Sequence, residues 1–273
     1  MSGHSLIFVH AHPDDECILT GATLAKATAV GLRTIVVYGS RGDAGETNAD
    51  LGGETLGARR VREAEAACAD LGVDRVEWLS FDDSGMAGTE TTTNPNAFSN
   101  AEPADVAAMV VDLVDGESVA AVVGYDANGT YGHPDHKQVH HVAHALGRRL
   151  STAWILEATY SREYLARLPG SDGELDLGFA AAEADLTHFV QGERFFQAKM
   201  SALANHLSQI PSDWDADNPD VDGFRARFGT EWFIAGPGPD ASPEGLEPLV
   251  ALLEPKASWP GPPTGGEQSG GEQ

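Results

Sequence analysis

The chain is poor in basic residues and in cysteine, and both shortages narrow the classes of protein to which it could belong. Lys and Arg number 17 against 42 Asp and Glu, so the formal net charge of the 273 residues is −25. This balance argues against nucleic acid or an anionic membrane as a partner, because contacts with phosphate groups need clustered Lys and Arg. The two cysteines, Cys17 and Cys68, are too few for a disulfide framework and favour reduced thiols in a cytoplasmic protein.

Long apolar runs are also missing. No stretch of 18 apolar residues occurs, so no membrane-spanning helix is expected. Residues 1–16 hold only a short apolar run before a charged cluster and have no basic leader, so they do not resemble a signal peptide. With 41% hydrophobic residues, the chain nevertheless has enough apolar side chains to bury a core. A folded cytoplasmic protein is expected, and the sequence leaves its oligomeric state unknown.

Segments typical of strands alternate with segments typical of helices over the first 160 residues. We expect strands at residues 5–9, 32–38, 76–81, 119–125 and 153–159, and helices at 16–30, 56–71, 105–114 and 134–150. Such alternation predicts crossover connections and therefore an α/β fold, with a mostly parallel, Rossmann-like sheet and helices on both faces. In such sheets, ligands bind at the carboxyl ends of the strands.

A single domain over residues 1–256 is expected. Within it, the polar segment 82–102 is longer than most loops, and loops of that length are usually functional or disordered. One further strand is expected at residues 231–235. From residue 257 the sequence becomes rich in Pro and Gly, which predicts a disordered tail over residues 257–273.

Two short motifs combine imidazole and carboxylate side chains, and each follows a predicted strand. They are AHPDDE at residues 11–16 and YGHPDH at residues 131–136. Because the carboxyl ends of parallel strands meet at one edge of a sheet, we expect both motifs on the same rim. His and Asp together suit zinc or another first-row divalent metal, and three protein ligands leave positions open for water and substrate. The two motifs therefore indicate a hydrolytic metal site.

Each motif has a simpler explanation when it is taken alone. An HPD turn is commonly a capped helix start, in which Asp14 or Asp15 accepts hydrogen bonds from backbone N–H groups. His10 lies on the strand itself and is expected to be a core residue or a support for a ligand. His140 and His144 are predicted to occupy ordinary helix positions, since three ligands already complete a site.

The paired motifs AHPDDE and HPDH resemble those of the LmbE-like (PIG-L) family of zinc-dependent N-acetylglucosaminyl deacetylases. The resemblance includes GDAGE at residues 42–46, RVRE at 60–63 and DSGMAGT at 83–89. DSGMAGT and the segment GYDANGTYGHPDH at residues 124–136 are most similar to the branch with the mycothiol-biosynthesis deacetylase and the mycothiol S-conjugate amidase. Related enzymes deacylate glycopeptide-antibiotic pseudoaglycones. A late pattern of Lys199, His206 and Gln209 is also similar to this branch; His206 either contacts the substrate or packs in the core.

This resemblance implies an LmbE-like fold and a zinc-dependent hydrolase, with Fe²⁺ or another divalent metal as the alternative ion. The metal ligands that it implies are His12, Asp15 and His136. Asp14 corresponds to the general base that activates a metal-bound water for attack on the amide. The other catalytic residues that it implies are His133 beside the oxyanion, Tyr131 at the amide carbonyl, and Asp135, which tunes His133.

The implied substrate is a small-molecule glycoside with an N-acetylated or N-acylated glucosamine. Residues 82–102 correspond to a substrate loop and residues 160–235 to a part that shapes the substrate pocket. The residues at family positions that hold the sugar are Arg60, Asp83, Met86 and Glu46.

Three alternatives stay open. The conjugate amidase of the family has a Lys shortly after its HPDDE motif, whereas here Thr20 is nearby and the first Lys is Lys26. Two His and one carboxylate also form the iron site of some oxygenases, although those sites usually lie in β-barrels. A metal-binding protein without catalysis is the third.

Overall fold

One eight-stranded sheet, with the order β3-β2-β1-β4-β5-β7-β6-β8, forms the centre of the computed structural model. The structure describes residues 4–150, 154–168, 177–210, 221–237 and 247–259. The strands are β1 (Ser5–His10), β2 (Arg33–Ser40), β3 (Arg75–Phe81), β4 (Val119–Tyr125), β5 (Trp154–Thr159), β6 (His188–Gln191), β7 (Thr230–Pro237) and β8 (Glu254–Pro255). From β3 to β5 every pairing is parallel, and β7, β6 and β8 join by antiparallel pairings.

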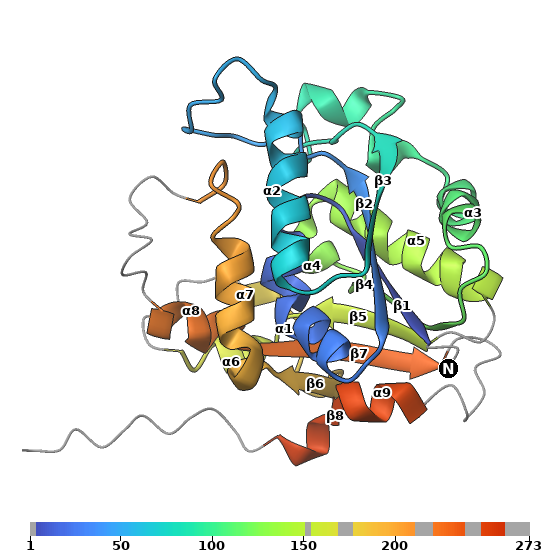
Figure 1. The fold of residues 1–273 in the computed structure, drawn as a ribbon, viewed down its shortest axis with the longest axis vertical. Helices are drawn as coiled ribbons and strands as arrows, with labels where there is room; N and C mark the ends of the chain where they lie inside the picture. The colour runs from blue at the N-terminus through green and yellow to red at the C-terminus, as the bar shows by residue number, and fades with distance from the viewer. Residues whose placement is uncertain (1–3, 151–153, 169–176, 211–220, 238–246, 260–273) are drawn as a thin grey trace, which may run out of the picture.

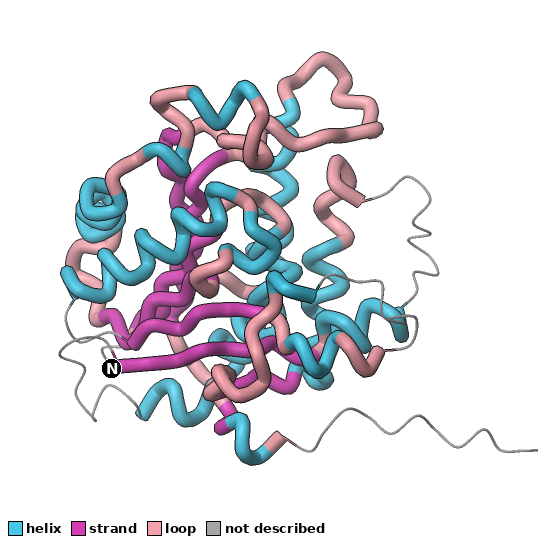
Figure 2. Tube along the Cα trace, turned by 180° about the vertical axis from the view of Figure 1, so that it is seen from behind, coloured by secondary structure: helices cyan, strands magenta, loops and turns pink. Residues whose placement is uncertain are grey.

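Helices cover both faces of this sheet (Figure 1). On one face α7 packs against both α1 and α2, and on the other face α3 packs against α5. The view from behind agrees, with α3 and α5 in front of the strands (Figure 2). The helices are α1 (Asp15–Ala29), α2 (Leu56–Asp70), α3 (Pro103–Leu113), α4 (Gly129–Gly132), α5 (Pro134–Leu150), α6 (Arg162–Leu165), α7 (Phe196–Leu203), α8 (Val221–Phe228) and α9 (Glu247–Leu252). The predicted mostly parallel, Rossmann-like α/β fold is confirmed.

The two central strands are buried along their whole length. All six residues of β1 (SLIFVH) and all seven of β4 (VAAVVGY) are buried. Continuous apolar runs of this kind are typical of parallel strands that helices cover on both faces. The sheet therefore fixes the two strand ends from which the AHPDDE and YGHPDH motifs emerge.

Most elements of the first 160 residues lie within two residues of their predicted bounds, and β4 and α5 coincide with them. The expected loop 82–102 contains two short 3-10 turns, Glu90–Thr93 and Phe98–Asn100, and Phe98 is buried. The sequence analysis did not anticipate β6, β8, α8 or α9. Trp259, inside the expected tail, packs against Tyr164 and Trp232, and residues 260–273 lie outside the described residues.

Two other expectations concern the cysteines and the absence of a membrane-spanning helix. Cys17 and Cys68 are both free and buried, in keeping with reduced thiols. Of the helices that the structure describes, none has the length and apolar character needed to cross a membrane.

A buried ion pair connects the C-terminal part of the chain to α1. Nζ of Lys199 on α7 donates to Oε1 of Glu231 on β7 at 2.7 Å and to the carbonyl of Ile18 at 2.9 Å. The Glu231 carboxylate also accepts hydrogen bonds from the backbone N–H groups of Ala22 and Thr23, each at 2.8 Å. Because α1 begins at Asp15, this contact holds the helix that carries one of the predicted metal ligands.

Candidate active site

The two His/Asp motifs meet at the carboxyl ends of β1 and β4. These strands are neighbours at the centre of the sheet, where the strand order reverses direction, and this is where open α/β sheets bind their ligands. The AHPDDE motif leads from β1 into α1, and the YGHPDH motif leads from β4 into α5. The predicted common rim is therefore present.

His12, Asp15 and His136 are all buried, and one ligand atom of each lies within 4.8 Å of the others. Nδ1 of His12 lies 3.7 Å from Oδ2 of Asp15, and Nε2 of His136 lies 3.4 Å from Oδ1 of Asp15. The structure thus brings together the three residues that the family resemblance implies as metal ligands.

The opposite nitrogen of each histidine already has a partner. Nε2 of His12 lies 3.1 Å from Oδ2 of Asp135 and 3.4 Å from Oδ1 of Asp83. Nδ1 of His136 lies 3.1 Å from Oγ1 of Thr130. Metal-binding histidines usually engage their second nitrogen in this way, which fixes the ring orientation and tautomer. The donor set therefore fits a divalent metal such as zinc, held by His12 Nδ1, His136 Nε2 and the Asp15 carboxylate.

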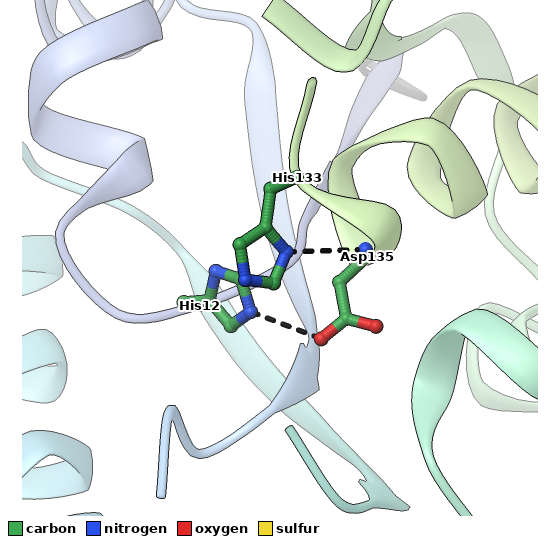
Figure 3. A group of neighbouring side chains, drawn as sticks. All are labelled: His12, His133 and Asp135. Carbon is green, nitrogen blue, oxygen red and sulfur yellow. Dashed lines mark hydrogen bonds and ion pairs between the residues drawn. The ribbon is translucent and has the colours of Figure 1, made fainter. Parts of the chain in front are cut away.

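A second group, His12, His133 and Asp135, also gathers possible ligand atoms (Figure 3). In this group, however, Nδ1 of His133 and both oxygens of the Asp135 carboxylate already accept hydrogen bonds. The backbone N–H of Asp135 donates to Nδ1 of His133 at 3.2 Å. The Asp135 carboxylate takes hydrogen bonds from the backbone N–H and the hydroxyl of Ser84, at 3.0 and 2.5 Å, besides its contact with His12. These bonds favour the first group as the metal site.

His133 is a neutral hydrogen-bond donor in this environment. Burial lowers the pKa of His133 to about 4. Because Nδ1 accepts from the backbone of Asp135, the proton of the neutral ring lies on Nε2. The Asp135 carboxylate itself faces His12 and Ser84, so its described hydrogen bond to His133 is through the backbone.

Tyr131 stands at the mouth of the site. Its side chain is half exposed, and its hydroxyl lies 3.3 Å from Nε2 of His136. The hydroxyl is thus at the nitrogen that faces the candidate metal position, where it could also reach a bound substrate.

Asp14 directly precedes Asp15 in the chain, and its side chain is paired with Arg60. Its carboxylate lies 3.3 Å from a terminal nitrogen of Arg60. Burial raises the pKa of Asp14 to about 6 against the opposing charge of Arg60. The same guanidinium donates to the carbonyls of Pro13 and Gly42, at 2.6 and 2.9 Å. Arg60 is therefore buried against the AHPDDE loop, and its predicted contact with a sugar stays a prediction.

Comparison with known proteins identifies the family. The model described as "GlcNAc-PI de-N-acetylase" (PIG-L) matches residues 7–146, just over half of the chain, and this range contains both motifs. The chain belongs to this family. A 1D-myo-inositol 2-acetamido-2-deoxy-alpha-D-glucopyranoside deacetylase of Salinispora arenicola is 31% identical, over 93% of each chain. The protein is an amide hydrolase of the N-deacetylase class.

Solved structures support the fold of this de-N-acetylase. The N,N'-diacetylchitobiose deacetylase from Pyrococcus horikoshii matches with a TM-score of 0.56 and 22% identity, over 86% of this chain and 84% of that chain. The A40926 pseudoaglycone deacetylase matches with a TM-score of 0.56 and 17% identity, over 85% of this chain and 97% of that chain. At these identities the likeness establishes the fold, and the expected LmbE-like architecture is confirmed.

Backbone strain in the de-N-acetylase lies at the site. Among the described residues other than glycine, only Asp14 (φ 95°) and Thr130 (φ 55°) have a positive φ. Asp14 adjoins the candidate metal ligand Asp15, and Thr130 contacts another candidate, His136. The Asp126 carboxylate accepts from the backbone N–H of Thr130 at 3.0 Å and so holds this turn. Strained residues persist where the surroundings hold them, and they are enriched at functional sites.

A buried pair supports the turn at Asp14. His206, which is fully buried, places Nε2 2.6 Å from Oε1 of Glu16, and the other oxygen of Glu16 accepts from the backbone N–H of Asp14 at 2.9 Å. Burial alone would lower the pKa of His206, but the charge and hydrogen bond of Glu16 raise it. Of the two predicted roles of His206, the buried one fits this position.

Replacing His206 by Gln is expected to lower kcat by about tenfold with little change in KM, because support residues of metal sites typically matter at this level. The change removes the imidazole ring that contacts Glu16, and Glu16 in turn accepts a hydrogen bond from the backbone of Asp14. Steady-state kinetics on the matched variant Leu207→Ala, at an exposed neighbour, should match the wild type. Equal kcat in both variants would show that Glu16 holds the turn unaided.

The predicted sugar-binding residues are only partly gathered. Asp83 is buried, and its hydrogen bonds with His12 hold its pKa below the usual range although burial opposes this. Asp83 also lines a cavity of about 520 Å³ together with Arg41, Asp43, Asp82, Thr91 and Asn94. Met86 is exposed on the same loop, and Glu46 is exposed, with its backbone carbonyl accepting from Gln209. Their contact with a substrate stays a prediction.

Several supporting residues of the de-N-acetylase site were missed by the sequence analysis. They are Glu16, Ser84, Asp126 and Thr130. All four are buried polar residues that lie within or near the recognised motifs. A polar residue next to a predicted ligand is the sequence feature that could have indicated them. His10 is buried between the hydroxyls of Tyr125 and Thr20, at 2.8 and 3.2 Å, which agrees with a supporting position.

Proposed function

We propose that this de-N-acetylase is a zinc-dependent hydrolase that removes the N-acetyl group from a glucosamine moiety of a small-molecule glycoside. The observation that carries the proposal is the convergence of His12 Nδ1 and His136 Nε2 on Asp15, each ring being oriented by a partner on its other nitrogen. The name of the Salinispora relative, a deacetylase of a glucosaminyl inositol, supports the substrate class.

His12, Asp15 and His136 would hold the zinc ion. When bound, the ion supplies Lewis acidity that lowers the pKa of a water and polarises the amide carbonyl. Asp14 is the group placed to accept the proton of the attacking water, because it adjoins Asp15 without sharing its hydrogen bonds. Arg60 keeps the Asp14 carboxylate in place at 3.3 Å.

His133 and Tyr131 supply hydrogen bonds where negative charge develops. The Nε2–H of neutral His133 is free of the contact that occupies Nδ1, so it can donate to the oxyanion of the tetrahedral intermediate. The Tyr131 hydroxyl, near His136, is the second donor. Asp135 orients two histidines: its backbone N–H donates to His133, and its carboxylate contacts His12.

The polar cavity beside Asp83 suits the hydroxyl groups of a sugar. Its lining combines the carboxylates of Asp43, Asp82 and Asp83 with the Arg41 guanidinium, and such groups bind vicinal hydroxyls through paired hydrogen bonds. Arg60, Met86 and Glu46 complete the proposed sugar-binding set. Tyr131 also lines an apolar cavity of about 250 Å³, together with Tyr160, Leu165, Leu168 and Phe179.

The alternatives receive less support. The S-conjugate amidase is not favoured, because the curated relatives are named deacetylases. An iron oxygenase or a metal-binding protein without catalysis is at odds with membership of a hydrolase family. Iron or another divalent ion in place of zinc is compatible with the same ligands. We also expect a cytoplasmic location, in line with two free, buried cysteines.

Metal removal tests the proposal directly. We expect the zinc-loaded protein to release free amine from at least one member of a panel of N-acetylglucosamine glycosides that carries inositol, a second sugar or a glycopeptide aglycone. A chelator should abolish release, and added Zn²⁺ or Fe²⁺ should restore it, which identifies the preferred ion. The matched O-acetyl sugars serve as controls for amide specificity. No amine from any glycoside with either ion would contradict the proposed function.

A further inference from the structure

A second cluster of metal-ligating side chains lies on α5, one helical turn beyond His136. It consists of His140 and His144 on α5 and Glu157 on β5, with one ligand atom of each within 4.8 Å of the others. Nε2 of His144 lies 2.5 Å from Oε1 of Glu157, and Nδ1 of His140 lies 3.4 Å from the same oxygen. The two imidazole rings are 4.5 Å apart.

We propose that His140, His144 and Glu157 form a second binding site for a divalent transition-metal ion, separate from the catalytic site. Histidines four residues apart lie on the same face of a helix, so their rings can approach one ion together. Two imidazoles and a carboxylate suit Zn²⁺, Co²⁺ or Ni²⁺ better than Mg²⁺, which prefers oxygen ligands. Three protein ligands again leave a coordination position for water.

The two rings are prepared for such a role. Nδ1 of His140 lies 3.1 Å from the carbonyl oxygen of Tyr125 and 3.4 Å from Oε1 of Glu157, so an ion bound at Nδ1 would replace the contact with the carbonyl and leave the ring proton on Nε2. Burial lowers the pKa of His140, so this ring is neutral near pH 7, as a ligand must be. At His144, a metal ion would replace the proton shared with Glu157.

An ion can reach the cluster from outside. The side chain of His144 is 36% exposed, whereas those of His140 and Glu157 are more buried. His144 and Glu157 line a surface cavity of about 370 Å³, together with Arg148, Ile155, Ile234 and Gly236. The cavity provides the entry path, and the guanidinium of Arg148 could retain an anion as a further ligand.

A metal ion here would link α5 to β5 directly. Strand β5 lies inside the sheet between β4 and β7, and helix α5 on its face also carries His136 of the candidate active site. Because the site exists only in the folded chain, binding would stabilise the fold by an amount set by the ion concentration and its dissociation constant.

Counting bound ions tests the proposal. Metal-depleted full-length protein is titrated with Co²⁺ and followed by elemental analysis and visible absorption. The wild type should bind two equivalents, and His144→Ala and Glu157→Gln should bind one. The control His141→Ala changes an exposed histidine of the same helix outside the cluster and should bind two. If both cluster variants bind as many equivalents as the wild type, the second site is refuted.

A second measurement keeps the test independent of the catalytic metal. In His12→Ala, which removes a catalytic ligand, Zn²⁺ should still raise Tm by several degrees, whereas Mg²⁺ should not. In the double variant His12→Ala/Glu157→Gln the Zn²⁺ effect should disappear. Circular dichroism identifies a variant that fails to fold, and Glu157→Gln preserves the side-chain volume. Equal Zn²⁺ shifts in the single and double variants would overturn the second site, whatever the fate of deacetylation.

Discussion

Replacing Asp14 by Asn is expected to lower kcat/KM for N-deacetylation by about 10²–10⁴-fold, the usual contribution of a general base. The variant should keep its catalytic metal, because the proposed ligand atoms belong to His12, Asp15 and His136. Asn has the volume of Asp and tolerates the positive φ of 95° at this position better than most residues. It also keeps a hydrogen-bond acceptor for Arg60, so the loss can be attributed to the missing proton acceptor.

The measurement pairs amine release with metal content. Asp112→Asn, at an exposed position on α3, is the matched control and should retain full activity and one catalytic metal equivalent. Activity of Asp14→Asn within about threefold of the wild type would remove Asp14 from the role of base. Loss of the metal in the same variant would instead make Asp14 a part of the metal site.

The catalytic cluster was predictable because its geometry follows from local sequence and from one rule about sheets. AHPDDE follows the apolar run of β1, and YGHPDH follows that of β4. Once the two strands are parallel neighbours, their carboxyl ends must meet, and the residues after them face each other. The contacts of His12 and His136 with Asp15 follow from this arrangement.

The supports of the cluster depend on contacts that no local pattern encodes. Ser84 reaches Asp135 from 51 positions away in the sequence, and His206 reaches Glu16 from 190 positions away. The positive φ of Thr130 arises from the turn that Asp126 holds, and threonine gives no sign of it. The antiparallel strands β6 and β8 are short, so hydrophobic periodicity over them is too brief to read.

The same limit explains why the role of Lys199 could not be read from the sequence. Its place in a family-like helix pattern was visible, but its partner Glu231 lies on β7, 32 residues later. In the structure the side chain of Lys199 is 0% exposed and that of Glu231 is 2% exposed. Nζ makes three hydrogen bonds, to Glu231 and to the carbonyls of Ile18 and Phe228. Buried ion pairs of this kind are satisfied only as a complete set.

Replacing Lys199 by Met is expected to destabilise the folded protein by about 3–5 kcal/mol, the usual cost of leaving a buried charge without its partner. Met keeps the apolar length of the Lys side chain, so the loss reflects the unpaired Glu231 carboxylate more than a cavity. At roughly 2–4 °C per kcal/mol for domains of about this size, Tm should fall by roughly 6–20 °C. Thermal unfolding monitored by circular dichroism measures the change.

Two further variants decide whether the cost comes from the charge. Lys256→Met breaks the more exposed pair with Glu183 and should cost at most about 1 kcal/mol. Adding Glu231→Gln to Lys199→Met removes the unpaired charge, so the double variant should be more stable than the sum of the single effects predicts. Additive effects would place the cost in lost packing and hydrogen bonds. A strongly non-additive result would mean that α1, and with it the metal ligand Asp15, is held by an ion pair from the opposite end of the chain.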